Sequence, residues 1–262
     1  MRRRGAVERA GEAGFLPFLF LAIALPVLAL TALLTPPGQS PDEPAQLIRA
    51  NSLLHGALMP LRKMGANPFT GRPIQQVGVK IDSGLLAASF GKTTLVDGHP
   101  VVTKADEAAL RAIPWTHQLV FASIPNTAAY FPLAYLPAVI GLEAGRLFGA
   151  SPFVCIIFAR LADVAAYLIV GAAALAVAAY GRALFLALLL LPMALFLGGT
   201  LDQDGILIAF TCLACAGLTR GTPGGRKLGL AVMLVVLLAK PPYLPVLWLF
   251  ALPLARPGFW RR

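Results

Sequence analysis

The sequence predicts an all-α polytopic membrane protein, and three observations support that fold class. Of its 262 residues, 58% are hydrophobic and 13% are charged, and the mean hydropathy is +0.75, which excludes an ordinary soluble domain. The apolar residues form runs long enough to enter a bilayer. The basic residues, which give a net charge of +10, form short clusters beside those runs without interleaved aromatic residues. They are typical of topology determinants, so we expect a lipid bilayer and no nucleic acid as a partner.

The N-terminal segment predicts a first span that stays in the mature protein. Residues 1–13 are basic and short, which places the N-terminus in the cytoplasm under the positive-inside rule. The apolar run Phe15–Leu34 is too long for the core of a signal peptide and lacks a clear small-residue cleavage site. At about 1.5 Å per residue this run is long enough to cross the bilayer.

The residues that follow, 35–127, predict one long polar loop on the outer side of the membrane. Within this loop, Lys104–Ile113 is typical of a short amphipathic helix, and the stretch around Gln75–Ile81 is compatible with a strand. A loop of roughly ninety residues with few large apolar side chains would make only a weak core of its own. We therefore expect it to pack on the membrane part.

Charge bias decides the topology of the remaining apolar runs. These runs lie at about Phe153–Tyr180, Ala183–Gly199, Gly205–Thr219, Leu228–Ala239 and Tyr243–Ala255. The segment 128–148 is also apolar, but it carries two prolines and two charged residues. If this segment does not cross, the later basic groups all lie in the cytoplasm: Arg182, Arg220–Lys227 and Arg256–Arg262. We therefore predict six spans, both termini inside, and an interfacial or re-entrant helix at 128–148.

The stretch Ser40–Gly56, directly after the first span, carries the strongest functional signal. Residues 14–41 contain no charge, and then Asp42 and Glu43 occur together. Because carboxylates are costly to place at the edge of a span, such a pair indicates a functional site. The alternative is that the two acids only cap a helix and favour its positive end.

The same stretch predicts the start and one face of a helix. Ser40 as the N-cap residue with Glu43 three positions later fits a capping box. If the helix continues, Asp42, Gln46 and Arg49 lie on one face. That face would present an acid, an amide and a cation at the membrane surface.

Two further polar points come to the outer side under this topology. One is the turn Thr200–Asp204, which contains the acids Asp202 and Asp204. The other is Lys240, which with two following prolines divides the last apolar stretch into two runs of about a dozen residues. Since neither run comfortably crosses the bilayer, Lys240 is expected in a depression below the outer surface.

Arg160 and Asp163 lie one turn apart in the outer part of the second span. Their spacing predicts an ion pair within one helix.

Five sequence blocks together carry a resemblance. They are PDEPA at Pro41–Ala45, NTAAYFPLAYLP at Asn126–Pro137, ARLAD at Ala159–Asp163, Pro192 leading to the acidic turn Asp202–Asp204, and KPPY at Lys240–Tyr243. From about residue 14 to 255 the chain resembles a domain-of-unknown-function family of predicted bacterial integral membrane proteins, placed in the GT-C glycosyltransferase superfamily. The Asp-Glu-Pro and Tyr-x-Pro-x-x-Tyr-x-Pro blocks are its more specific parts.

The resemblance implies a single GT-C-like domain over 1–262 in the bacterial cytoplasmic membrane. Helices 42–56 and 128–148 would lie along the membrane in the first outer loop. The enzyme would transfer a sugar from a polyprenyl-phosphate donor to a cell-envelope glycan or lipid acceptor, generally with inversion. Two features depart from the pattern: Gln46 stands where the family usually has His, and the chain stops after about six spans, as a shortened member would.

The chemistry of such a transfer assigns roles to the polar residues. An acceptor hydroxyl must lose its proton, for which Asp42 is the candidate base and Glu43 its support. The departing phosphate needs a cation, for which Arg49 and Lys240 are candidates. The substrate-binding set is completed by Gln46, Tyr130 and Arg160. The resemblance further implies that Asp202 and Asp204 bind a divalent metal ion or orient the acceptor.

Two other function classes remain open at this stage. One is a membrane protein of the same fold that binds or presents a lipid-linked glycan without catalysis. The other is a transporter or flippase, which should place charged residues near the middle of several spans. Here the charged residues gather at one surface, which disfavours transport.

Overall fold

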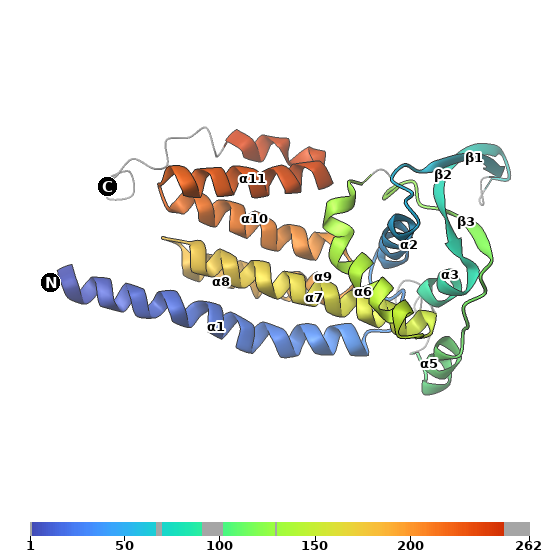
Figure 1. Ribbon diagram of the computed structural model, residues 1–262, viewed down its shortest axis with the longest axis horizontal. Coiled ribbons are helices and arrows are strands. Elements are labelled where there is room, and N and C mark those ends of the chain that lie inside the picture. The colour runs from blue at the N-terminus through green and yellow to red at the C-terminus, as the bar shows by residue number, and fades with distance from the viewer. Residues whose placement is uncertain (1, 67–69, 91–101, 129, 249–262) are drawn as a thin grey trace. The chain divides into compact units, whose positions relative to one another are not determined.

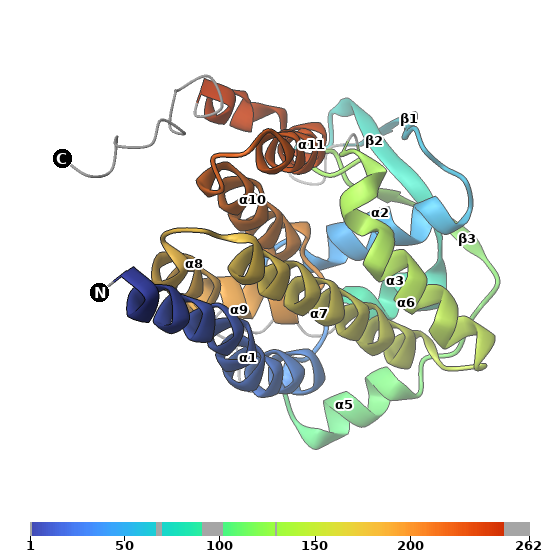
Figure 2. The same cartoon turned by 60° about the vertical axis from the view of Figure 1, so that its left-hand side comes forward.

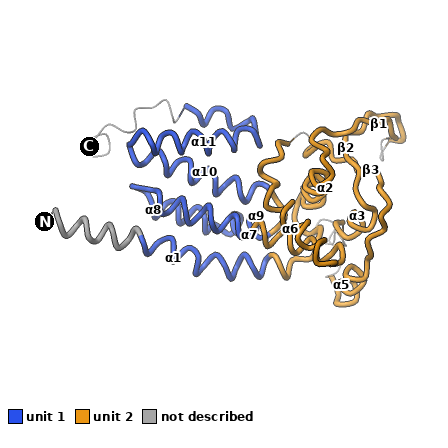
Figure 3. The backbone as a smooth tube through the Cα atoms, viewed as in Figure 1, with its two compact units in different colours: residues 1–31, 164–199, 203–262 blue, residues 32–163, 200–202 orange. Residues whose placement is uncertain are grey.

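The computed structural model describes the backbone of residues 2–66, 70–90, 102–128 and 130–248 (Figure 1). Side chains are described only from Gly14 onward. Its contacts divide the chain into two compact units (Figure 3). The first unit comprises residues 1–31, 164–199 and 203–262, and the second comprises residues 32–163 and 200–202. Each unit is described by itself.

Long apolar helices dominate the first unit and confirm a helical membrane protein. The helices that lie wholly in this unit are α8 (Arg182–Leu189), α9 (Pro192–Gly199), α10 (Gln203–Thr219) and α11 (Pro223–Ala239), followed by the 3₁₀ helix η2 (Pro241–Leu247). α1 (Arg2–Leu34) belongs to it up to residue 31 and α7 (Pro152–Val177) from residue 164, and the remainder of both belongs to the second unit. Among the described residues, Gly14–Leu34 and Pro152–Val177 are long and apolar enough to cross a membrane. The pair α8 and α9 makes a third candidate if it counts as one bent span. Six spans therefore remain a prediction.

One predicted span is broken. The run Ala183–Gly199 forms α8 and α9, which are bent by 58° relative to each other. Pro192 explains the break, because it lacks an N–H group and its ring disfavours helical backbone in the residue before it. The carbonyl of Leu189 at the end of α8 is not left unsatisfied, since the hydroxyl of Tyr167 donates a hydrogen bond to it at 2.7 Å.

Small residues let the helices of the first unit approach closely. A Cβ added at Gly205 on α10 would lie 2.7 Å from the backbone of Gly198 on α9. A Cβ at Gly199 would lie 2.7 Å from the side chain of Thr31 on α1. Such contacts are typical of helix packing in membranes, where van der Waals contact supplies much of the stabilisation.

The second unit contains a three-stranded antiparallel sheet together with short helices (Figure 2). The strands are β1 (Leu61–Ala66), β2 (Pro73–Asp82) and β3 (Leu119–Ser123), in the order β1-β2-β3. The helices are α2 (Glu43–Leu54), α3 (Ser83–Phe90), α5 (Lys104–Arg111), the 3₁₀ helix η1 (Pro132–Tyr135) and α6 (Leu136–Leu147). The all-α prediction was therefore too narrow, because the polar loop folds partly as a sheet.

Details inside this loop agree with the sequence patterns. The predicted amphipathic helix is α5, which begins with a capping box between Thr103 and Asp106. The predicted strand around Gln75–Ile81 lies within β2. The inner face of the sheet carries buried Val79, Ile81 and Ala122, which join one hydrophobic core with residues of α2, α3, α6 and the first half of α7.

Asp82, at the end of β2, fastens the sheet to α3. Its carboxylate accepts hydrogen bonds from the backbone amides of Gly84 and Leu85 and from the amide and hydroxyl of Thr116. Burial alone would raise the pKa of Asp82, but these hydrogen bonds outweigh it, so the pKa lies below its ordinary value.

Candidate functional site

The helix after the first span begins two residues later than predicted. α2 begins at Glu43, and Asp42 stands as its N-cap residue with φ of 60°, in the left-handed region, without a side-chain capping bond. The capping box was therefore wrong, because Ser40 Oγ donates to Thr200 Oγ1 at 3.3 Å and makes no cap. Asp42 itself is exposed.

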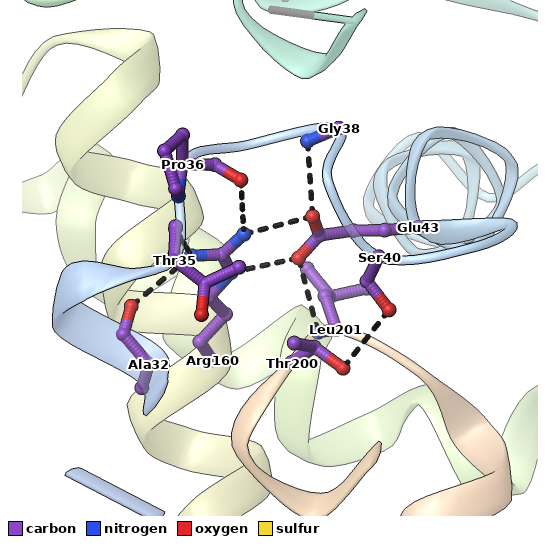
Figure 4. Close-up of polar contacts among 9 residues, drawn as sticks. All are labelled: Ala32, Thr35, Pro36, Gly38, Ser40, Glu43, Arg160, Thr200 and Leu201. Carbon is purple, nitrogen blue, oxygen red and sulfur yellow. Dashed lines mark hydrogen bonds and ion pairs between the residues drawn. The ribbon is translucent and has the colours of Figure 1, made fainter. Parts of the chain in front are cut away.

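Glu43 has the opposite environment, since it is almost completely buried (1% exposed) and its carboxylate is fully engaged (Figure 4). Arg160 donates from Nε to Oε1 at 2.7 Å and from Nη2 to Oε2 at 2.8 Å. The backbone amide of Gly38 donates to Oε2 at 3.1 Å, and that of Leu201 donates to Oε1 at 3.2 Å. Four donors from three separate parts of the second unit thus hold one side chain.

Gly38 shows how tightly the chain turns beside this carboxylate. Its φ is +79°, and a Cβ there would lie 2.4 Å from the backbone oxygen of Phe90. Only glycine adopts this conformation without strain and leaves room for that approach. The loop between α1 and α2 is therefore fixed both by its own backbone and by Glu43.

Arg160 on α7 completes this cluster from the other side. Its remaining N–H groups donate to three carbonyls near the end of α1: Nη1 to Ala32 at 3.1 Å and to Thr35, and Nη2 to Pro36 at 3.4 Å. The Ala32 and Thr35 carbonyls lie at or just beyond the end of α1, where backbone carbonyls have no partner within the helix, and the Pro36 carbonyl also accepts from the amide of Gln39 at 3.3 Å. The structure therefore pairs Arg160 with Glu43, in place of the predicted pair with Asp163 within α7. With its donors used inside the protein, Arg160 acts as a positioning residue.

Asp163 serves a different helix. It is buried and accepts a hydrogen bond from the backbone of Ala138, in the first turn of α6. An acid at that place complements the positive end of the α6 dipole. Its carboxylate also lies close enough to Asp202 and Glu43 for their negative charges to act on it. The second unit therefore gathers three acids with Arg160.

Gln46 is held by a tyrosine that was not among the predicted site residues, although the sequence predicted it at headgroup depth with Tyr130. Tyr135 is buried (2% exposed), and its hydroxyl donates to Oε1 of Gln46 at 2.5 Å. Tyr135 is the second tyrosine of the Tyr-x-Pro-x-x-Tyr-x-Pro block, and that repeated aromatic pattern was the signal available for finding it. This bond joins α2 to η1 and fixes the amide one turn after Asp42.

Arg49 closes the other end of α2. Its guanidinium donates to the carbonyls of Ala57, Leu58 and Tyr130 at 3.0, 2.9 and 3.0 Å. Burial lowers the pKa of Arg49, and the electrostatic effect of the neighbouring Tyr135 hydroxyl, when ionised, opposes that shift. Two of the expected binding residues thus meet here, because the backbone carbonyl of Tyr130 accepts a hydrogen bond from Arg49. Arg49 also fixes the segment that follows α2 through the carbonyls of Ala57 and Leu58.

The D-x-D acids belong to different units. Asp202 lies in the second unit, where its charge acts on Asp163, whereas Asp204 in the first turn of α10 forms an ion pair with Lys240 in the first unit. Among the described residues, no group of three or more His, Cys, Asp or Glu side chains is arranged to hold a metal ion.

Beside Asp204, the buried amide of Gln203 has both polar atoms without a hydrogen-bond partner among the described residues. Sequence reasoning missed Gln203 because a glutamine between two aspartates has no distinctive pattern.

Comparison with known proteins leads to a family. No curated protein and no solved structure matches the chain. The sequence profile of a family described as predicted membrane protein matches residues 25–262, nearly the whole chain, and agrees with the candidate membrane-spanning helices found in the structure. The chain thus belongs to DUF2142, a family of predicted membrane proteins.

Proposed function

We propose that this protein is a GT-C-type membrane glycosyltransferase. It transfers a sugar from a polyprenyl-phosphate donor to a cell-envelope glycan or lipid acceptor outside the cytoplasm. The observation that carries the proposal is the contrast between two adjacent acids. Glu43 is buried and engaged by four donors, whereas Asp42 is exposed on a backbone that those contacts fix.

The backbone of Asp42 supports a functional reading of this contrast. A φ of 60° is uncommon outside glycine, although aspartate tolerates it better than most residues. Residues held in such conformations occur often at functional sites, where the surroundings determine them. Here the surroundings are the Glu43–Arg160 pair, Gly38 and the Gln46–Tyr135 bond. A capping role alone would not explain Asp42, because its side chain makes no capping bond.

The proposed reaction needs one base at the acceptor. Asp42 takes the proton of an acceptor hydroxyl while that oxygen forms a bond to the anomeric carbon of the donor sugar. The bond between the anomeric carbon and the phosphate oxygen breaks, and the lipid phosphate departs with the bonding electrons. Attack opposite to the departing oxygen inverts the anomeric centre.

Lys240 is our proposed contact to the donor phosphate in the first unit. Its ammonium group forms an ion pair with Asp204, and its side chain is 23% exposed. The donor phosphate is a diester, which carries one negative charge like a carboxylate and has two non-bridging oxygens that can accept from an ammonium group; the departing lipid phosphate is a monoester and gains a further negative charge. We therefore propose that the donor phosphate replaces Asp204 as the partner of Lys240 when the donor binds.

Transfer of a labelled sugar from polyprenyl phosphate, measured with the purified full chain in lipid, tests this function. Asp42→Asn keeps the size of the side chain and also tolerates a positive φ, so the protein should fold. If Asp42 is the base, transfer falls about a hundredfold or more. Asp202→Asn and Asp204→Asn serve as matched variants.

The possible results separate the function classes. If Asp42→Asn stays active while Asp202→Asn or Asp204→Asn is inactive, the base has been assigned to the wrong acid. If all three variants transfer at the wild-type rate, the acids have no catalytic role. If the wild-type protein binds the labelled donor but never transfers it, a protein that binds or presents lipid-linked glycan is the better description.

A further inference from the structure

The outer face of the sheet in the second unit has an unusual composition. Strand pairing places Leu61 and Lys63 of β1 on the same face as Lys80 of β2 and as Leu119 and Phe121 of β3. The opposite face carries the buried core residues. Leu61 is 47% exposed and Leu119 is 57% exposed. The register also puts Gln76 and Ser123 on this face, but an antiparallel sheet with one face in water normally shows mostly polar side chains there, so the exposed leucines beside the lysines favour a partner.

The segment between α2 and β1 extends this surface. Leu58 is 62% exposed and Met59 is 81% exposed. A shallow pocket of about 360 Å³ lies here, lined by His55, Met59, Leu61, Val79, Lys80 and Leu119 among others. Apolar side chains and basic groups therefore meet in one place.

The charge of this surface has one sign. The described residues 55–66, 70–82 and 119–123 contain the cations Arg62, Lys63, Arg72 and Lys80, and Asp82 as their one acid; the strand register puts Lys63 and Lys80 on the outer face and Arg62 on the opposite face. Asp82 cannot neutralise them at the surface, because its carboxylate is buried and bonded to Gly84, Leu85 and Thr116. One of the cations, Lys63, lies over the ring of Phe121 with its Nζ 5.9 Å from the centroid, so its charge is held at the outer face.

We propose that this face binds the surface of a phospholipid bilayer that contains anionic headgroups. Leu58, Met59 and Leu61 enter the boundary between headgroups and acyl chains, while Lys63 and Lys80 contact lipid phosphates. Apolar side chains mixed with lysine and arginine are typical of surfaces that lie in this boundary. The two candidate membrane helices of the chain, Gly14–Leu34 and Pro152–Val177, precede and follow this segment in the sequence, so a bilayer is its nearest large apolar phase.

Two other partners fit the surface less well. A second copy of the chain would bring the same cations against each other, and their repulsion opposes that contact. A peptide strand could pair with the free edge of β1, but Arg62 and Lys63 on that edge are the kind of residues that block strand addition. A bilayer with anionic lipid satisfies both the charge and the apolar side chains.

The test places a fluorescent probe on the full-length protein in lipid nanodiscs. Cys155, Cys212 and Cys215 are replaced, and Met59→Cys is labelled with a small fluorophore. Ala108→Cys on α5 is the matched control, because it is exposed among charged residues of both signs. Quenching by a lipid with a nitroxide near its headgroup is compared with quenching by iodide in water. Nanodiscs of phosphatidylcholine alone are compared with nanodiscs containing about one third phosphatidylglycerol.

We expect the Met59 probe to be quenched at least threefold more by the nitroxide lipid than the Ala108 probe, and to be shielded from iodide. The difference should grow with phosphatidylglycerol and should lose that dependence in Lys63→Gln/Lys80→Gln, which changes only exposed side chains. If the two probes respond alike in both lipids, the sheet faces water and the proposal is wrong. If shielding of the Met59 probe needs two protein copies per nanodisc, a second copy is the partner, and the proposal is equally wrong. Neither result depends on glycosyl transfer.

Discussion

Removing Arg160 should destabilise the second unit more than any other single charge change at the candidate site. Arg160→Met keeps much of the side-chain length but leaves the buried carboxylate of Glu43 with two backbone donors, from Gly38 and Leu201. The carbonyls of residues 32, 35 and 36 each lose a donor as well, and among the described residues only the last keeps another, the amide of Gln39. Breaking a buried ion pair by removing one partner typically costs about 3–5 kcal/mol, and we expect a loss of that size in the free energy of unfolding.

Unfolding of the purified protein by SDS in mixed micelles measures this loss. Glu43→Gln should also destabilise, because it leaves the guanidinium buried without its counter-charge. The double variant Glu43→Gln/Arg160→Met should lose clearly less than the sum of the two single variants, since it contains no uncompensated buried charge. Arg146→Met is the matched control: Arg146 is exposed and lies over the ring of Trp115, 5.3 Å from its centroid. We expect that change to cost about 1 kcal/mol or less.

The reasoning would be refuted by a loss below about 1 kcal/mol for Arg160→Met, the range of exposed ion pairs. Strict additivity in the double variant would refute it too. In either case the contacts around Glu43 would not fix the backbone that presents Asp42, and the main support for the proposed base would be gone.

Three further results are expected. The hydrogen bonds to Asp82 lower its pKa, so the carboxylate stabilises the fold above about pH 4, and this stabilisation is lost as the pH falls through the folded pKa. The fluorescence of Trp115, recorded with Trp248 and Trp260 replaced, should report the loss. Asp82→Asn should make the stability independent of pH in this range. Thr222→Cys in a chain without other cysteines should resist labelling from outside, whereas outside labelling would overturn the six-span topology. Lys240→Ala should weaken binding of the polyprenyl-phosphate donor about tenfold, as loss of one charge-assisted contact does, and unchanged affinity would remove Lys240 from the donor site.

The sequence was informative about the fold where a pattern is local. Hydropathy located both candidate membrane-spanning helices, and the amphipathic pattern over Lys104–Ile113 located α5. Pro192 also predicts a break within the apolar run Ala183–Gly199, but hydropathy alone predicted one continuous span there. The sheet was only partly foreseen, because β1 and β3 pair with β2 across loops whose closure no local pattern reports. Predicted segments within 249–262, including Arg256–Arg262, lie outside the described residues.

The sequence predicted which residues belong to the candidate site better than it predicted the contacts that they make. Asp42, Glu43, Gln46, Arg49 and Arg160 were all selected from the sequence, and the structure places all five in the second unit. Several of their partners come from 81 to 158 positions away, as Tyr130 does for Arg49 and Leu201 does for Glu43, although Gly38, Ala57 and Leu58 are local. A helical repeat predicts neighbours three or four positions apart, and for that reason Arg160 was assigned to Asp163. Whether the acids catalyse, and whether a metal binds Asp202 and Asp204, stay predictions.

The spread of the Glu43 contacts along the chain has a consequence for biosynthesis. Leu201 follows Glu43 by 158 residues, and Arg160 follows it by 117. At about 5–20 residues per second, the ribosome needs roughly 8–30 s to make the last of these partners after Glu43 has emerged. For roughly the first 6–23 s of that interval, before Arg160 is made, the carboxylate of Glu43 lacks its counter-charge. The chain between α1 and α2 is then free to move, and the insertion machinery or a chaperone has time to act on it before Asp42 acquires its final backbone.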